Sequence, residues 1–328
     1  LENKEPRLEN QNERIAAQEE REEKNQEKFG KPYHPVTGFA ARALMSVRTI
    51  SGTYTQNDGM LLPGFNEEAQ FFGMNSTMIS DSKIKGFAIG QQQRNVFGKE
   101  TGYEFAPYAG SNGFVVDTSG LNTQHTIMHA QNYNLRASIE PIKDLKVDLT
   151  MKRNFTENTS SYYRFSDSLQ NFENQSEFKT TTVSYSTISI RSAFEVMDSD
   201  FRSPSFDNLR AKREEVSQAL GEGNPYSLSD SSGYLDGYGP SQQDVLIGAF
   251  LNTFSGKKTS RKTISPVKNV PLPNWQVSYN GLTKFDFFKK YVQNFTLRHG
   301  YNSSVTVAGM QTNLNAEVDD DGYLSARD

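Results

Sequence analysis

Two neighbouring stretches of alternating apolar and polar residues constrain the fold of this chain more than any other feature. A period of two is that of a β-strand, whose successive side chains point to opposite faces. A short connection at 140–144 separates the two stretches. The alternating apolar residues are Tyr133, Leu135, Ala137, Ile139, Leu145, Val147, Leu149 and Met151. A slip of one residue would exchange the two faces, so the sequence predicts an antiparallel hairpin with a fixed register.

The same period recurs in other parts of the chain. We expect strands at 39–55, 275–279 and 295–307, and weaker ones near 84–94 and 178–195. The first should end at Asn57-Asp58-Gly59, since these residue types favour turns. Residues 281–291, rich in Lys and Phe, are expected to connect two strands.

The segment between the strand regions has a helical pattern instead. Ser203 or Ser205 is expected to cap a helix that has Pro204 in its first turn and ends near Gly221. A second helix is expected from Ser241 to Gly256, and its apolar stretch 245–251 implies burial within protein. Residues 256–273 are expected to be a solvated basic linker that contains proline.

Composition excludes several classes of protein. The 328 residues contain no cysteine, which rules out disulfides and thiolate metal sites. The formal net charge is −4, so no basic excess suggests nucleic acid as a partner. No apolar run approaches the roughly 20 residues of a membrane-spanning helix. The chain opens in a charged tract and is expected to be an internal segment of a longer protein.

Strands with one apolar and one polar face are compatible with two environments. In a soluble β-sandwich the apolar face packs on a second sheet, whereas in an outer-membrane barrel it meets lipid. Long strands, and tight turns beside polar excursions of 25 or more residues, favour the barrel. A hydrophobic content of 35% is low for a large soluble core and also favours it. We therefore expect an all-β fold, an antiparallel transmembrane β-barrel segment with a helical insert.

This interpretation divides the chain into four parts. They are a charged helical or disordered arm at 1–31, barrel strands and loops at 32–197, a helical insert with the basic linker at 198–274, and barrel strands at 275–328. The insert would cap the barrel or lie in its lumen. If 140–144 and 282–291 are turns on the same side of the membrane, the crossings between them must be even in number. One clear candidate lies between 166 and 274, so either a strand is hidden in the insert or the insert passes through the lumen.

The polar faces of the strands carry the candidate functional residues. Long charged side chains there would line a wide aqueous lumen. The lumen-facing candidates are Arg42, Arg48, Arg136, Lys146, Asp148, Lys152 and Arg298.

No catalytic constellation emerges from the motifs. His125 and His129 share a face of a strand, but zinc needs a third ligand and none lies nearby in sequence, so ordinary polar positions are favoured. The acidic run at 319–321 lacks the alternate spacing of a calcium loop. We expect neither a cofactor nor a metal, and the chain is not expected to be an enzyme.

Several ordered motifs resemble a known family. They lie at 32–35, 39–45, 139–150, 237–247 and 272–282, and include the runs Pro-Tyr-His-Pro at 32–35 and Leu-Pro-Asn-Trp at 272–275. Together they resemble the SprA/Sov family, the outer-membrane translocon proteins of the type IX secretion system and gliding motility in Bacteroidetes. The motifs are spread over residues 32–308, nearly the whole chain.

The resemblance implies an internal segment of a very large single-chain barrel in the Gram-negative outer membrane. Such a barrel conducts folded proteins from the periplasm to the cell surface. The implied partners are a PorV-like barrel protein at a lateral opening, a periplasmic plug protein, secreted cargo proteins with C-terminal signals and outer-membrane lipid. The alternatives are an outer-membrane transporter of nutrients or lipopolysaccharide and a soluble β-sandwich surface adhesin.

Overall fold

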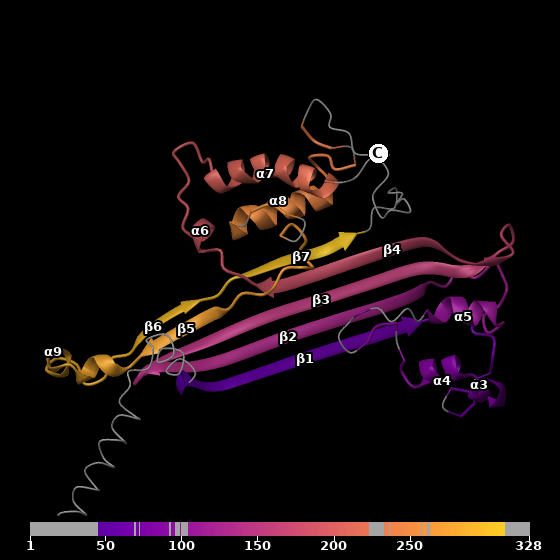
Figure 1. The fold of residues 1–328 in the computed structure, drawn as a ribbon, viewed down its shortest axis with the longest axis horizontal. Coiled ribbons are helices and arrows are strands. Elements are labelled where there is room, and N and C mark those ends of the chain that lie inside the picture. Colours follow the sequence, from indigo (N-terminus) through magenta and orange to yellow (C-terminus); the bar gives the residue numbers. More distant parts are fainter. Residues whose placement is uncertain are drawn as a thin grey trace, which may run out of the picture.

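A single antiparallel sheet of long strands forms the centre of the molecule (Figure 1). The computed structural model describes residues 45–311, apart from 69, 72, 92, 96–98, 100–103, 223–232, 236, 257 and 261–262. The strands are β1 (Val47–Leu61), β2 (His125–Ile142), β3 (Leu145–Ser166), β4 (Asn171–Ser186), β5 (Asn274–Tyr279), β6 (Leu297–Tyr301) and β7 (Ser304–Gln311). The sheet is not closed into a barrel.

Helices accompany the sheet, so the fold is mixed, and the prediction of an all-β class was too narrow. They are α3 (Ser76–Ser80), α4 (Ser82–Ala88), α5 (Phe105–Ser111), α6 (Ile190–Ala193), α7 (Pro204–Gly221), α8 (Gln243–Ser255), the 3₁₀ helix η1 (Gly281–Lys284) and α9 (Asp286–Lys289). Antiparallel pairing and a helical insert are confirmed.

The predicted hairpin is confirmed as β2 and β3. Its register pairs Leu135 with Met151 and Ile139 with Val147, so the apolar residues of both strands share one face. The turn is shorter than expected, because β2 continues to Ile142 and the chain reverses at Lys143 and Asp144. Asp144 has a φ of 70°, a left-handed conformation that Asp tolerates in turns.

Two local predictions were wrong. Asn57-Asp58-Gly59 forms no turn but continues β1, where Asp58 pairs with His129. The backbone partners supplied by β2 outweigh the local turn preference of these residues. The strand expected near 84–94 is also wrong for its first part, which is α4. Asp81 caps this helix by accepting from the Ile84 N–H, and the Ile84 side chain is buried.

The pairing of β3 shows how many crossings lie between the connections at 140–144 and 282–291. On the side away from β2, β3 pairs with β5 over Leu145–Thr150 and with β4 over Arg153–Ser166. Therefore β4 and β5 lie end to end and are the two halves of one crossing. In the same way β6 pairs with β5 and β7 with β4, with two residues between them. The even count thus needs neither a hidden strand nor passage of the insert through a lumen.

Residues 187–273 leave the sheet between these halves and form a helical layer. Leu251 of α8 packs on Phe155, Val183 and Tyr185 of the sheet. The predicted helices are confirmed, with the Ser203 side chain accepting from the Phe206 N–H at the start of α7. The linker after α8 is not simply solvated, because Ile264 is buried in a core with Val216 and Ala249 and Val267 packs against the sheet core.

The connection between β1 and β2, residues 62–124, forms a second helical layer. Its core contains Met78, Ile84, Phe105 and Ala109, and Phe172 of β4 packs against it. Figure 1 shows α3, α4 and α5 at one end of the sheet, while α9 lies beyond the opposite end. Both helical layers contact the sheet away from the tight β2–β3 turn.

Candidate functional site

The charged candidates from the sequence gather on one face of the sheet, here called the polar face. Arg136 on β2 pairs with Thr150, Lys152 pairs with Asn134, and Asp148 pairs with Ser138. Lys146 and Arg298 both pair with Ser278 of β5, so these three residues form one row. Alternation places them opposite the apolar residues of the same strands. Arg42 lies outside the described residues.

Two ion pairs organise the polar face near the tight turn. Arg48 Nε donates to Glu140 Oε2 at 2.9 Å, and Lys146 Nζ lies 3.2 Å from Asp148 Oδ2. The side chains of Arg48 and Lys146 are 64% and 59% exposed. Exposed pairs of this kind contribute little to stability, on the order of 0–1 kcal/mol. What they provide is a hydrated surface on β1, β2 and β3 near the turn.

The opposite face is apolar over the half of the sheet nearest the turn, and we call this area the apolar band. Ile50 is 73% exposed and Leu135 is 42% exposed, and no band residue on β2, β3, β5 or β6 is buried by the described part of the chain. Trp275 Nε1 donates to the Nδ1 of His299, a polar exception within the band, at 3.4 Å. The band comprises Ile50, Leu135, Ala137, Ile139, Leu145, Val147, Leu149, Met151, Trp275, Val277, Tyr279 and Leu297.

The same face is covered over its other half. Phe155, Tyr163 and Val183 are each at most 6% exposed beneath the two helical layers. The boundary lies at Arg153, whose guanidinium donates to the carbonyl of Val267 at 2.9 Å and lies over the rings of Tyr133 and Phe155. One face of one sheet is therefore divided along the strands into an uncovered apolar zone and a covered zone.

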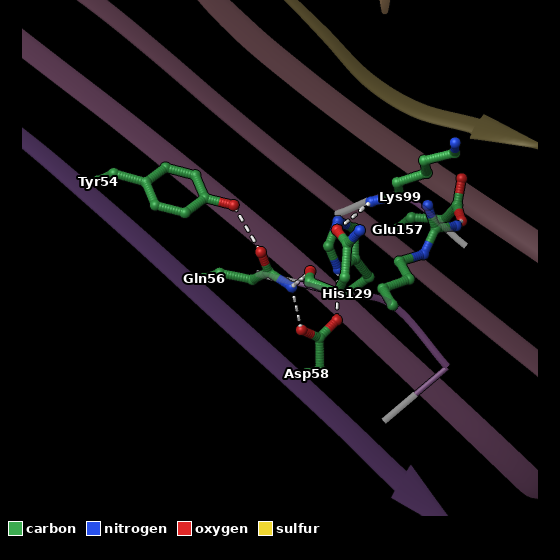
Figure 2. A network of polar contacts seen from close by, with 8 residues as sticks. Tyr54, Gln56, Asp58, Lys99, His129 and Glu157 are labelled. Carbon is green, nitrogen blue, oxygen red and sulfur yellow. Dashed lines mark hydrogen bonds and ion pairs between the residues drawn. The ribbon is translucent and has the colours of Figure 1, made fainter. Parts of the chain in front are cut away.

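A polar network lies beneath the β1–β2 connection in the covered zone (Figure 2). Gln56 connects Tyr54 to Asp58 along β1, and Asp58 contacts the Nδ1 of His129 on β2. Gln56 Nε2 also donates to the carbonyl of Asn95 at 2.7 Å. These contacts attach the connection to the sheet.

Charged groups continue this network across the sheet. Glu157 on β3 forms ion pairs with Arg94 of the connection and with Lys179 of β4. Sequence reasoning missed the cluster because Asp58 was assigned to a turn. Its signal was the two-residue spacing of Gln56, Asp58 and Met60, which continues the alternation of β1.

A cavity of about 260 Å³ adjoins this network and has His125 in its lining. His125 is 4% exposed, and its Nε2 has no hydrogen-bond partner among the described residues. Burial lowers the pKa of His125 and raises that of neighbouring Tyr163 to about 12, so both rings stay neutral near pH 7. Within the described residues, no three His, Asp or Glu side chains come together as a metal site.

A polar junction closes the gap where the insert leaves the sheet. Ser186 Oγ accepts from the Lys152 N–H at 3.1 Å and donates to the Leu272 carbonyl at 2.7 Å. The Leu272 N–H in turn donates to the Ser186 carbonyl at 2.9 Å. On the next crossing, Asn274 Oδ1 accepts from the Ser303 N–H at 3.0 Å. The hydrogen bonding of the sheet is thus maintained across the break between β4 and β5.

The insert lies on the same face as the apolar band. Phe155, Val183 and Tyr185, which contact α8, occupy the face opposite Lys152 and Asp148. An insert in this position cannot share a lumen with the charged residues of the polar face. The two expectations, charged residues lining a lumen and an insert within that lumen, therefore exclude each other.

Comparisons of the chain with protein-family models and with curated proteins found no match. Among the described helices, none is both long and apolar enough to cross a membrane.

Proposed function

We propose that this chain is a wall segment of an outer-membrane β-barrel that conducts folded proteins from the periplasm to the cell surface. The observation that carries the proposal is the apolar band on strands whose other face bears exposed charges. In a barrel, such a band meets lipid and the charged face lines an aqueous lumen.

The dimensions of the sheet support a wall that extends beyond the bilayer. From Leu145 to Met151, β3 spans about 23 Å at roughly 3.3 Å per residue, which at a tilt of about 35–45° is about 16–19 Å of the ~25 Å height of the apolar band in outer-membrane barrels. The whole of β3 has 22 residues. At the same rise it is about 73 Å long, well over the ~30 Å hydrocarbon thickness even when tilted. The band would lie in the membrane and the covered zone outside it.

The edges of the sheet support a larger assembly of strands. Within the described residues, no strand pairs with the outer edge of β1 or of β6 and β7. Long unpaired edges invite further pairing, and closure into a barrel removes them. We therefore propose that additional strands of the same barrel continue the sheet on both sides.

The helical insert was expected to cap the barrel or lie in its lumen, and the proposed wall places it elsewhere. With the charged face toward the lumen, α7 and α8 lie on the outside of the wall, beyond the lipid zone. The sequence resemblance to the SprA/Sov family adds the proposed cargo class, folded proteins with C-terminal signals. It also adds a PorV-like barrel protein, a periplasmic plug protein and lipid as proposed partners.

Two other functions share part of this geometry. A transporter of nutrients or lipopolysaccharide would have the same wall but a different lumen content. A β-sandwich adhesin would need a second sheet over the apolar band, and in the described part of the chain no such sheet covers it. Carbonate would release an adhesin from membranes, whereas a barrel requires detergent.

Photo-crosslinking in the full-length protein tests conduction directly. A photoreactive residue at Lys152, on the polar face, is expected to capture secreted proteins that carry C-terminal signals. The matched control at Leu149, three residues away on the other face, should capture none. Absence of cargo at Lys152, or equal capture at both positions, would contradict the proposed conduit.

A further inference from the structure

The connection between β5 and β6, residues 280–296, lies beyond the end of the sheet next to the apolar band, and we call it the rim segment (Figure 1). It is fixed to the tight β2–β3 turn. The Asn280 N–H donates to the Asp144 carbonyl at 3.0 Å, and Lys284 forms an ion pair with the Asp144 carboxylate. Gly281 packs so closely on the Tyr279 ring that a Cβ there would lie 2.5 Å from the tyrosine hydroxyl. The rim segment therefore has a defined position relative to the band.

Aromatic side chains of the rim segment form an exposed cluster. Phe287 is 72% exposed and Tyr291 is 69% exposed. The ring of Phe287 lies 5.4 Å from that of Phe288 and 5.8 Å from that of Tyr291, and Phe288 stacks on Phe295 at 6.1 Å. The rings are thus contiguous, and a contiguous exposed apolar patch marks an interaction surface more often than scattered residues do.

Basic residues accompany the rings. Lys289 and Lys290 are exposed, and neither has an ion-pair partner among the described residues. The Lys290 ammonium lies 5.6 Å from the centre of the Tyr291 ring. Aromatic rings beside lysines whose stems lie along apolar surface are the combination found at membrane–water interfaces.

We propose that the rim segment inserts its aromatic cluster into the phospholipid headgroup layer, with Lys289 and Lys290 at the phosphates. The inference rests on the proposed membrane wall and adds the depth at which the wall is held. Its position follows from continuity with the band, because Tyr279 ends the band on β5 and the rim segment begins at the next residue. In barrels, aromatic residues flank the apolar band at this level.

Depth-dependent quenching in the full-length protein tests this placement. The protein is reconstituted into vesicles of phosphatidylethanolamine and phosphatidylglycerol, with an environment-sensitive fluorophore on a single introduced cysteine. The labelled variants are Phe287→Cys in the rim segment, Leu135→Cys in the band and Phe201→Cys in the insert. Phe201 is the matched control, since this Phe is 83% exposed yet lies far along the chain from the rim.

Four patterns of quenching decide the outcome. The inference predicts that lipid-borne quenchers at headgroup depth act most on position 287, mid-chain quenchers on 135 and aqueous iodide on 201. Mid-chain quenching at 135 with iodide quenching at 287 would overturn the rim proposal and leave the wall intact. Iodide quenching at 135 would overturn both. Protection of 287 from lipid and iodide alike would assign the cluster to a protein partner and reject the lipid.

Discussion

At the scale of single residues, Ser186 has a role that its burial and contacts define. Its hydroxyl accepts from the Lys152 N–H and donates to the Leu272 carbonyl at 3% exposure. Ser186→Ala would leave both backbone groups without this partner, at a cost of about 1–3 kcal/mol. We expect a lower midpoint of thermal unfolding and faster hydrogen exchange at the Lys152 amide.

A neighbouring serine provides the control for this prediction. Ser184 Oγ accepts from the Thr306 hydroxyl at 2.9 Å at an exposed site, where water replaces the lost bond. Ser184→Ala should lower the free energy of unfolding by much less than Ser186→Ala does, because water can hydrogen-bond to the hydroxyl of Thr306. Equal destabilisation by the two changes would show that the junction does not depend on the Ser186 hydroxyl.

His125 gives a prediction with a definite dependence on pH. Burial lowers its pKa below the ordinary value of 6.5, so the unfolded chain binds a proton that the folded chain resists. The stabilising contribution is complete above pH 6.5 and is lost as the pH falls through the lowered pKa. The loss approaches about 1.4 kcal/mol for each unit by which the pKa is lowered.

His125→Gln removes this titration. The midpoint of thermal unfolding should therefore fall less in the variant than in the unmodified protein as the pH is lowered from about 7.5 to about 5, the range in which histidine changes charge. Glu104, Glu177 and Lys179 also line the cavity and are unchanged in the variant. The measurement is the unfolding midpoint against pH for both proteins. Parallel curves would exclude His125 as the source of acid sensitivity.

At the scale of elements, the divided crossing predicts how the insert can be removed. Arg153 pairs with Tyr185, so continuing β4 past Ser186 places residue 187 opposite Met151. The next position faces Thr150, which Asn274 now occupies. Deleting residues 188–273 therefore yields one continuous strand in register, and we expect the full-length protein still to assemble into the proposed barrel, measured as resistance to heat and protease.

Removing one residue more provides the control. Deletion of 187–273 places every residue after the joint on the wrong face, because the side-chain period is two. This variant should fail to assemble although it differs by a single threonine. The first deletion should itself lower stability, since it uncovers Phe155, Val183 and Tyr185, worth about 1.5–3 kcal/mol per apolar side chain. Assembly of both variants, or of neither, would refute the divided crossing.

Local sequence patterns predicted some elements well and missed others for identifiable reasons. The β2–β3 hairpin, α7 and α8 have their signals within a few residues, namely alternation, the Ser203 cap and Gly256 at the end of α8. The union of β4 and β5 had no local signal, because residues 187–273 separate its halves. The Asp58–His129 contact was missed for a similar reason, since it depends on pairing between β1 and β2 across 71 positions.

The polar face was the most predictable part of the candidate site. Alternation alone sufficed to group Arg136, Lys146, Asp148 and Lys152, and the structure places them on one side. Which layer covers the other side was not predictable, because α8 reaches Val183 only through the tertiary fold. The sequence therefore indicated two faces but not the division of one face along its length.

At the scale of the whole molecule, this division of one face distinguishes the proposed membrane wall from a soluble sheet. We propose that the apolar band near the β2–β3 turn meets lipid, that the polar face meets water, and that the helical layers cover the wall beyond the lipid. Burial in the covered zone is strong, with Val183 at 0% exposure, whereas Leu135 in the band is 42% exposed. A soluble sheet would gain by covering both zones, since each buried apolar Å² contributes about 25 cal/mol.

Thiol accessibility along β3 tests the proposed surroundings of the two faces. Single cysteines replace residues 145–152 in the full-length protein, in intact outer membranes, and react with a membrane-impermeant thiol reagent. We predict labelling at Lys146, Asp148, Thr150 and Lys152 and protection at Leu145, Val147, Leu149 and Met151. Labelling on both faces, or protection of the charged positions, would contradict this prediction.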